Sequence, residues 1–212
     1  AEQQALTQML GPRAESLAEE AQLVRAARDH QGPSSSGGGE TDSAAEEETP
    51  DDVATTPVLE DLAPVPGDLE HNRRLVETGL AAAGDLGAQW VLTPELCTCG
   101  YEFVERLGDE WIQPQPDAWT QKVQRLLAQR GMTCFLAQPE RDPQTNQCYN
   151  AVFAFGADGI LVGKHRKISV IPGAESAWAT PGTEEVAPVA TTPLKAGLLI
   201  CADAYPPTHV DR

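Results

Sequence analysis

Residues 147–167 read QCYNAVFAFGADGILVGKHRK, and this stretch decides the fold. Two runs rich in apolar residues flank the sequence Ala157-Asp158-Gly159, a pattern that is typical of a β-hairpin. The second run leads into the basic cluster 164–167. The hairpin therefore predicts a strand that delivers charged side chains to one end of a sheet, where α/β proteins usually place their chemistry.

Segments with helical and strand-like patterns surround the hairpin. We predict helices over 67–88 and 118–131, the first beginning near Asp68 and the second closed by Gly131. In the first helix, we expect the buried positions to be Leu69, Leu75, Val76 and Leu80. Further strands are predicted over 53–62, 89–96, 132–140 and 196–205. Helices that alternate with pairs of strands favour a layered α/β sandwich over a simple parallel, doubly wound sheet.

The N-terminal quarter of the chain has a different composition. Residues 1–52 contain twelve acidic residues and three arginines, a net charge of −9, while residues 53–212 carry −8. Residues 31–52 contain no aromatic and almost no large aliphatic residue, so they cannot bury enough surface to offset the entropy of ordering. We predict an acidic, mostly disordered tail over 1–52, with a short helix over 15–30, and a domain over 53–212.

Composition also limits partners and location. A net charge of −17 argues against nucleic acid or an anionic membrane as partner, because both are bound by basic patches. No run approaches 18 apolar residues, so no membrane span is expected. Five cysteines without a regular framework fit a reduced, cytoplasmic protein. The four cysteines besides Cys201 lack metal-ligand spacing with a histidine, so no metal and no cofactor is expected.

Three predicted strands end in reactive side chains, namely Glu95, Lys167 and Cys201. A cysteine thiol is mostly protonated at neutral pH and needs a base to become a nucleophile. A carboxylate in a closed pocket can have its pKa raised and take that proton. A fixed ammonium can stabilise the oxyanion that forms when the thiolate attacks a carbonyl or nitrile carbon. The three residues together therefore predict an acyl-transfer site.

Three sequences around these residues carry a family resemblance: TPELCTCGYEF, GKHRKISVIPGAESAW and GLLICADAYPP. Together they resemble the nitrilase superfamily, the carbon–nitrogen hydrolases. They occur in the family's order, with 72 residues from Glu95 to Lys167 and 34 from Lys167 to Cys201. The sequence PGDLEHNRR resembles the start of the family's first helix. Two departures are His165 before Arg166, where an aromatic is commoner, and the sequence CTC at 97–99.

The resemblance implies roles for individual residues. Glu95 matches the general base, Lys167 the catalytic lysine and Cys201 the nucleophile. Glu175 matches the second glutamate that several amidase branches use to position the substrate and the lysine. The backbone N–H of Ala202 is expected to join Lys167 in binding the oxyanion.

The resemblance further implies an α-β-β-α sandwich, here incomplete, because only eleven residues follow Cys201. The implied activity is hydrolysis of a non-peptide carbon–nitrogen bond in a small molecule, an amide in preference to a nitrile, through a cysteine thioester. The resemblance leaves open a homo-oligomer, formed if the missing C-terminal part is present.

Several alternatives remain at this stage. The chain could be an inactive or truncated nitrilase-like fragment that acts as a binding or regulatory module. Cys201 could be a small core residue, Glu95 a charge that follows a strand, or Glu175 a plain loop charge. Cys201 could also pair with His165 in a Cys–His dyad. Lys164 is assigned to a solvated face, which leaves Lys167 as the lysine of the site.

Overall fold

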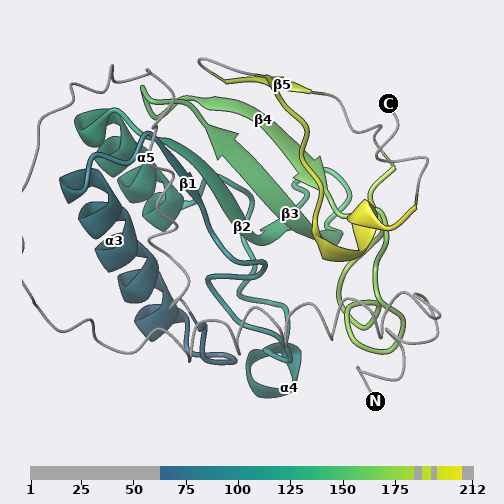
Figure 1. The fold of residues 1–212 in the computed structure, drawn as a ribbon. Helices are drawn as coiled ribbons and strands as arrows, with labels where there is room; N and C mark the ends of the chain where they lie inside the picture. The colour runs from purple at the N-terminus through teal and green to yellow at the C-terminus, as the bar shows by residue number, and fades with distance from the viewer. Residues whose placement is uncertain (1–62, 184–187, 192–194, 207–212) are drawn as a thin grey trace, which may run out of the picture. The chain divides into compact units, whose positions relative to one another are not determined.

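The computed structural model describes residues 63–183, 188–191 and 195–206 (Figure 1). All of them belong to the second of the two units into which the chain divides, Thr56–Arg212. The helix predicted over 15–30, the tail over 31–52 and the strand predicted over 53–62 lie outside the described residues.

A four-stranded mixed sheet forms the centre of the described domain. Its strands follow the order β1 (Trp90–Leu92), β2 (Thr133–Arg141), β3 (Cys148–Phe155) and β4 (Leu161–Arg166). β1 pairs with β2 in parallel, whereas the β2–β3 and β3–β4 pairs are antiparallel. The strands predicted over 89–96 and 132–140 are confirmed, although β1 ends at Leu92.

The predicted hairpin is confirmed as β3 and β4. Gly159 takes a φ of +76° in the turn, and its N–H donates to the Gly156 carbonyl at 2.8 Å. The Gln124 side-chain amide donates to the Gly159 carbonyl at 2.9 Å, which connects the hairpin turn to the helix that contains Gln124. A Cβ at Gly159 would lie 2.3 Å from the Gln124 carbonyl oxygen, so only glycine fits here.

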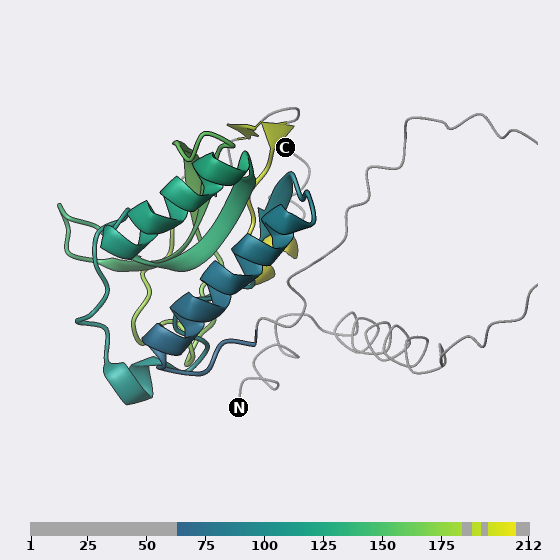
Figure 2. The ribbon, with the colours of Figure 1, turned by 90° about the vertical axis from the view of Figure 1, so that its left-hand side faces the viewer.

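Two helices, α3 (Leu69–Asp85) and α5 (Ala118–Arg130), lie side by side on one face of the sheet (Figure 2). Both begin at a predicted position, because Asp68 accepts the His71 N–H and Asp117 accepts the Thr120 N–H. α5 ends at Gly131, which has a φ of +66° and caps the helix, as predicted.

The buried face of α3 differs from the prediction at two positions. Val76 and Leu80 are buried as expected, whereas Leu69 and Leu75 are only partly buried. Asn72 takes a place on the buried face, because its side-chain amide bonds both main-chain groups of Val65. The prediction assumed that the large apolar residues form the buried face. The buried positions of α3 are instead 72, 76, 80 and 83.

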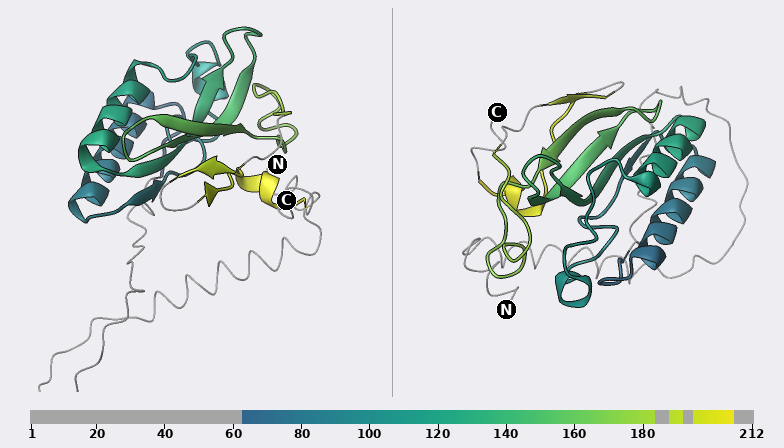
Figure 3. Two further views of the ribbon diagram at one scale, coloured as in Figure 1. Left: turned by 90° about the horizontal axis from the view of Figure 1, so that it is seen from above. Right: turned by 180° about the vertical axis from the view of Figure 1, so that it is seen from behind.

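The opposite face of the sheet is covered by a short strand pair, β5 (Val189–Ala190) and β6 (Lys195–Ala196) (Figure 3). The strand predicted over 196–205 is therefore wrong in its length. Leu198 and Ile200 are buried against the sheet face without a strand assignment. The chain then enters a 3₁₀ turn, η1 (Cys201–Ala204).

The described domain therefore has a helix layer, a mixed sheet and a thin strand layer (Figure 1). This is the arrangement of the predicted α/β sandwich, present in part. The short helix α4 (Val104–Leu107) was not predicted. Over the described ranges, with their gaps at 184–187 and 192–194, no helix has the length and apolar character needed to cross a bilayer.

Candidate active site

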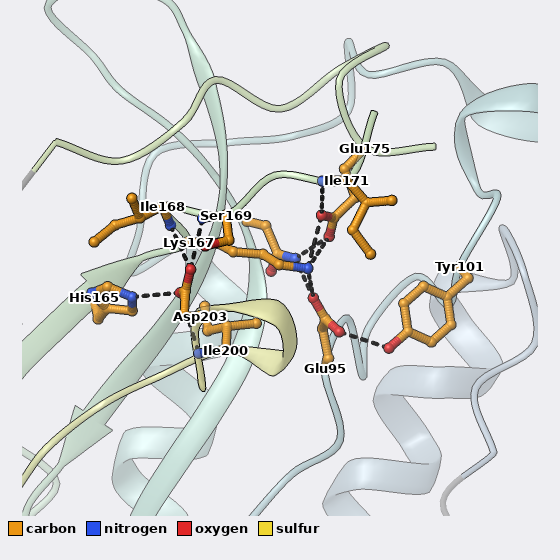
Figure 4. A network of polar contacts seen from close by, with 11 residues as sticks. Glu95, Tyr101, His165, Lys167, Ile168, Ser169, Ile171, Glu175, Ile200 and Asp203 are labelled. Atoms are coloured by element: carbon orange, nitrogen blue, oxygen red, sulfur yellow. Dashed lines mark hydrogen bonds and ion pairs between the residues drawn. The ribbon is translucent and has the colours of Figure 1, made fainter. Parts of the chain in front are cut away.

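Four loops carry the predicted site residues, and Figure 4 shows how Glu95, Lys167 and Glu175 meet. Glu95 lies in the turn that follows β1, Lys167 comes directly after β4, and Glu175 lies in the next turn of the chain. Cys201 begins η1. Glu95, Lys167 and Glu175 form one polar network, and Cys201 lies next to it.

Lys167 is the centre of this network. Its Nζ lies 2.7 Å from Glu95 Oε1 and 2.8 Å from the Glu175 carboxylate, and the residue is fully buried. Its main-chain N–H donates to the Asn150 carbonyl, and its carbonyl accepts the Gly182 N–H, both at 2.8 Å. The lysine is thus fixed through its backbone and through its ammonium.

Asn150 is a site residue that the sequence analysis missed. Its Nδ2 donates to Glu95 Oε1 at 2.7 Å and to Glu175 Oε1 at 2.8 Å, and its side chain is buried. It therefore bridges the same two carboxylates as Lys167. The available signal was a lone amide inside the apolar strand CYNAVFAF, since a buried polar side chain needs a partner.

Each of the two carboxylates also accepts a hydrogen bond from a further group. The Tyr101 hydroxyl donates to Glu95 Oε2 at 2.7 Å, and the tyrosine is 45% exposed. The Ile171 N–H donates to Glu175 Oε2 at 2.9 Å. Glu95 consequently faces the surface side of the network through Tyr101, whereas Glu175 is tied to its own loop.

The pKa directions separate the two glutamates. Burial acts to raise the pKa of Glu95, but the Lys167 charge and the hydrogen bonds from Lys167, Tyr101 and Asn150 outweigh it and hold this pKa below its usual value. Burial raises the pKa of Glu175. The two carboxylates raise the pKa of Lys167 despite its burial, so its ammonium stays charged. Glu95 therefore lacks the raised pKa that a buried carboxylate can have, because Lys167 contacts it directly.

Cys201 differs from the other cysteines of the domain. It is exposed, whereas Cys97, Cys99, Cys134 and Cys148 are buried. Its φ of +47° is unusual for a residue with a Cβ and marks a strained turn, as found at functional sites. Although the residue is exposed, partial burial of its thiol, together with the charges of Glu95 and Glu175, raises its pKa, and Glu95 accepts a hydrogen bond from the thiol.

The rival assignment of Cys201 to a dyad with His165 is not what the structure contains. His165 Nε2 lies 2.8 Å from Asp203 Oδ2, and both side chains are buried. Ala202, the predicted oxyanion residue, is the second residue of η1. The first N–H groups of a helical turn have no partner within the turn, which suits the assigned role.

Lys164 requires a correction. It was assigned to a solvated face, yet its ammonium binds the buried Glu140 carboxylate at 2.8 and 2.9 Å and is 32% exposed. Arg166 binds the same carboxylate. The alternation of β4 sends Lys164 and Arg166 to this ion pair, so Lys167 is the lysine that meets Glu95 and Glu175.

An open pocket of about 410 Å³ borders the site. Its walls include the apolar side chains of Trp90, Phe135 and Val152, and Glu95 and Cys201 also line it. Within the part of the chain that the structure describes, no three His, Cys, Asp or Glu side chains are grouped so as to hold a metal ion.

Comparisons with known proteins give a family match and several similar proteins. The model of the carbon–nitrogen hydrolase family matches residues 59–210. The glutamine-dependent NAD(+) synthetase of Thermotoga maritima is 29% identical over 155 residues, which are 71% of this chain and 26% of that protein.

Two solved structures have a similar fold. An amidase from Nesterenkonia sp. has a TM-score of 0.59 and 25% identity, over 69% of this chain and 55% of its own. Nit3 of Saccharomyces cerevisiae, a member of branch 10 of the nitrilase superfamily, has a TM-score of 0.60 and 27% identity, over 69% and 54%. The chain thus spans about half the length of these structures. With its family match over 59–210, the chain belongs to the carbon–nitrogen hydrolase family.

Proposed function

We propose that the protein hydrolyses the carbon–nitrogen bond of a small, non-peptide amide through a thioester on Cys201. The observation that carries the proposal is the buried Lys167 ammonium, which contacts Glu95 and Glu175 beside the turn that presents Cys201. Base, cation and nucleophile are the three groups that acyl transfer to a thiol requires.

During acylation the Cys201 thiol gives its proton to Glu95. The sulfur attacks the amide carbon, and the carbonyl oxygen takes up negative charge beside Lys167 Nζ and the Ala202 N–H. Because the thiol pKa is raised and the Glu95 pKa is lowered, a free thiolate is unfavourable in the resting site. The proton therefore moves as the sulfur–carbon bond forms, when charge passes from sulfur to the oxyanion.

Collapse of the tetrahedral intermediate breaks the carbon–nitrogen bond. The leaving nitrogen takes the proton from Glu95 and departs as ammonia or an amine. Glu95, again ionised, then removes a proton from a water molecule whose oxygen attacks the thioester carbon. The carboxylic acid leaves, and the sulfur regains a proton from Glu95. One water is consumed for each amide.

Two observations support an amide rather than a nitrile. Glu175 contacts Lys167 at 2.8 Å, as expected for the second glutamate of amidase branches. One similar structure, 25% identical, is an amidase. The alternative is a nitrilase-like binding module without activity.

Substitution of the nucleophile tests the proposal. Cys201→Ala and Cys201→Ser should abolish hydrolysis of small aliphatic amides. Both should also lack the acyl adduct that mass spectrometry should detect on the parent protein after brief mixing with the amide. Cys97→Ala, Cys99→Ala and Cys134→Ala should retain most of the activity. Turnover by Cys201→Ala within tenfold of the parent, about 1.4 kcal/mol of barrier, contradicts the assignment. A parent protein that neither turns over nor acylates favours the binding module.

A further inference from the structure

The Asp203 carboxylate is fully buried two residues after Cys201. Its Oδ1 accepts the Ile168 N–H at 3.1 Å and the Ser169 N–H at 2.7 Å. Its Oδ2 accepts the Ile200 N–H at 3.3 Å. Ile168 and Ser169 directly follow Lys167, and Ile200 directly precedes Cys201, so one carboxylate bonds the backbone beside both groups.

His165 supplies a further contact to the same carboxylate. Its Nε2 lies 2.8 Å from Asp203 Oδ2, and it occupies β4 two residues before Lys167 (Figure 4). Burial acts to raise the pKa of Asp203, but the hydrogen bonds from His165 and Ser169 outweigh it and keep the carboxyl ionised. With Asp203 ionised, His165 Nε2 carries the hydrogen of this bond.

We propose that Asp203 and His165 form a positioning pair that holds the Cys201 turn against the end of the Lys167 strand. The proposal rests on the proposed function, because it assigns the geometry of that reaction to two residues that need not touch the substrate. Neither residue lies in the network of Lys167, Glu95 and Glu175. The pair reaches that network through the main chain beside Lys167 and Cys201.

Two physical arguments explain why a carboxylate stands at position 203 and why the backbone of Cys201 must be held. An ionised carboxylate accepts several hydrogen bonds, whereas the amide of an asparagine has a single acceptor oxygen and turns an NH₂ donor toward the remaining N–H groups. The left-handed φ of Cys201 persists only if the surrounding structure holds it. Asp203 provides that hold, because it bonds the residue before the cysteine from two residues after it.

The cysteines of the domain provide a readout that separates local from global effects. Iodoacetamide should alkylate the exposed Cys201 in the folded protein, and the four buried cysteines only after unfolding. Mass spectrometry of the intact full chain counts the adducts. The pH midpoint of Cys201 alkylation reports the surroundings of the thiol, because burial and the charges of Glu95 and Glu175 raise its pKa, whereas Lys167 lowers it.

Asp203→Asn is the first variant. It should lower kcat for a small amide about 100-fold, as expected for a shift of the nucleophile by about 1 Å. KM should stay within about threefold, because a displaced nucleophile affects the transition state more than binding. The midpoint of Cys201 alkylation should fall by about half a pH unit or more as the thiol leaves the two carboxylates. An unchanged midpoint with a single adduct overturns the proposal.

His165 keeps the proposal testable if Asp203→Asn does not fold, a result that five adducts would reveal. His165→Phe removes the donor at similar volume and should shift the alkylation midpoint in the same direction, with kcat reduced at least tenfold. His165→Gln retains an N–H donor, so it should restore the alkylation midpoint to that of the parent and kcat to within about threefold of the parent. Parent-like values for His165→Phe overturn the proposal.

Glu140→Gln is the matched control, because it neutralises another buried carboxylate at the end of β2. It should lower the melting temperature and leave the Cys201 midpoint unchanged. Failure of the proposed function is recognised separately. If the parent hydrolyses no amide, the alkylation midpoints of Asp203→Asn and His165→Phe still decide whether the pair positions Cys201.

Discussion

At the scale of single residues, the site is one cation held between two anions. Lys167, Glu95 and Glu175 carry a formal charge of −1 together, and Asn150 adds an uncharged donor to both carboxylates. A buried charge is costly unless it is paired and hydrogen-bonded. Removing any member therefore leaves a buried partner unsatisfied, which makes these positions sensitive to substitution.

The first prediction concerns Lys167. Lys167→Ala should lower kcat/KM for a small amide at least 100-fold, because it removes an oxyanion donor and the charge partner of the base. Lys167→Arg should not restore activity, since a planar guanidinium does not replace a compact ammonium between two carboxylates. Steady-state kinetics on folded protein measure both values.

Lys164→Ala is the control for that prediction. Lys164 is partly exposed and pairs with Glu140, which keeps Arg166 as partner, so its loss should cost about 1 kcal/mol of stability and little activity. An inactive Lys164→Ala beside an active Lys167→Ala would show that the lysine assignment is wrong, and the role of Glu175 with it.

The second prediction concerns Asn150. Asn150→Ala removes the second donor shared by Glu95 and Glu175, so kcat should fall about tenfold or more through disorder of the base. Asn150→Asp should be worse, because a third carboxylate would meet the first two. Gln138→Ala is the matched control, since Gln138 is a buried amide of β2 that bonds Gln115 and Thr120 instead. Equal losses of kcat in the two alanine variants would contradict the role of Asn150.

The third prediction concerns pH. Because the folded pKa of Glu95 lies below 4.5, the base stays ionised at neutral pH, and kcat/KM should fall only as the pH drops through that lowered value. Tyr101→Phe removes a hydrogen bond that favours the ionised form, so the pKa rises and the acid limb moves to higher pH. Tyr149→Phe is the control. The Tyr149 hydroxyl donates to Gln147 and not to Glu95, so its loss should leave the acid limb of the pH profile unchanged.

At the scale of elements, the hairpin turn packs closely against α5 at Gly159. The fourth prediction compares two glycines of positive φ. Gly131→Ala meets no atom within 4 Å and should cost about 1–2 kcal/mol from backbone strain alone. Gly159→Ala meets the Gln124 carbonyl at 2.3 Å and should cost more. Denaturant unfolding measures the difference, and equal costs would contradict the close approach of the turn to α5.

How far the elements could be predicted depends on whether their signals are local. Asp68, Asp117 and Gly131 mark helix ends through bonds within a few residues, and those boundaries are confirmed. The strand expected over 196–205 failed because an apolar run alone does not determine strand pairing. Leu198 and Ile200 satisfy their hydrophobicity by packing on the sheet face.

The site shows the same division. The positions of Glu95, Lys167, Glu175 and Cys201 followed from motifs and a family resemblance, and the first three are in contact as expected. Asn150 and the Asp203–His165 pair could not be assigned, because their partners lie 25 to 55 residues away in the sequence. No local pattern states which buried polar side chains will meet.

At the scale of the molecule, the two faces of the sheet differ. α3 and α5 cover one face with a continuous apolar core, whereas the other face carries a short strand pair and an open pocket. Leu92, at the end of β1, remains 65% exposed and lines that pocket. The site lies where this thinner layer meets the sheet, since Cys201 follows the segment that packs on it.

The fifth prediction concerns residues 1–52. This segment lacks core-forming side chains over 31–52, so its deletion should leave the melting temperature and the amide kinetics unchanged. Differential scanning calorimetry of the shortened and full chains makes the comparison. A melting temperature lower by several degrees would show that the predicted helix over 15–30 stabilises the domain.

The backbone of Lys167 has a consequence for motion. Its N–H donates to the Asn150 carbonyl in β3, and its carbonyl accepts the N–H of Gly182, which belongs to a separate segment. A fluctuation of one loop cannot expose this residue, because two separate segments must part together. The ammonium is therefore attached to a part of the domain whose local opening costs more free energy, while the cysteine that it serves is exposed.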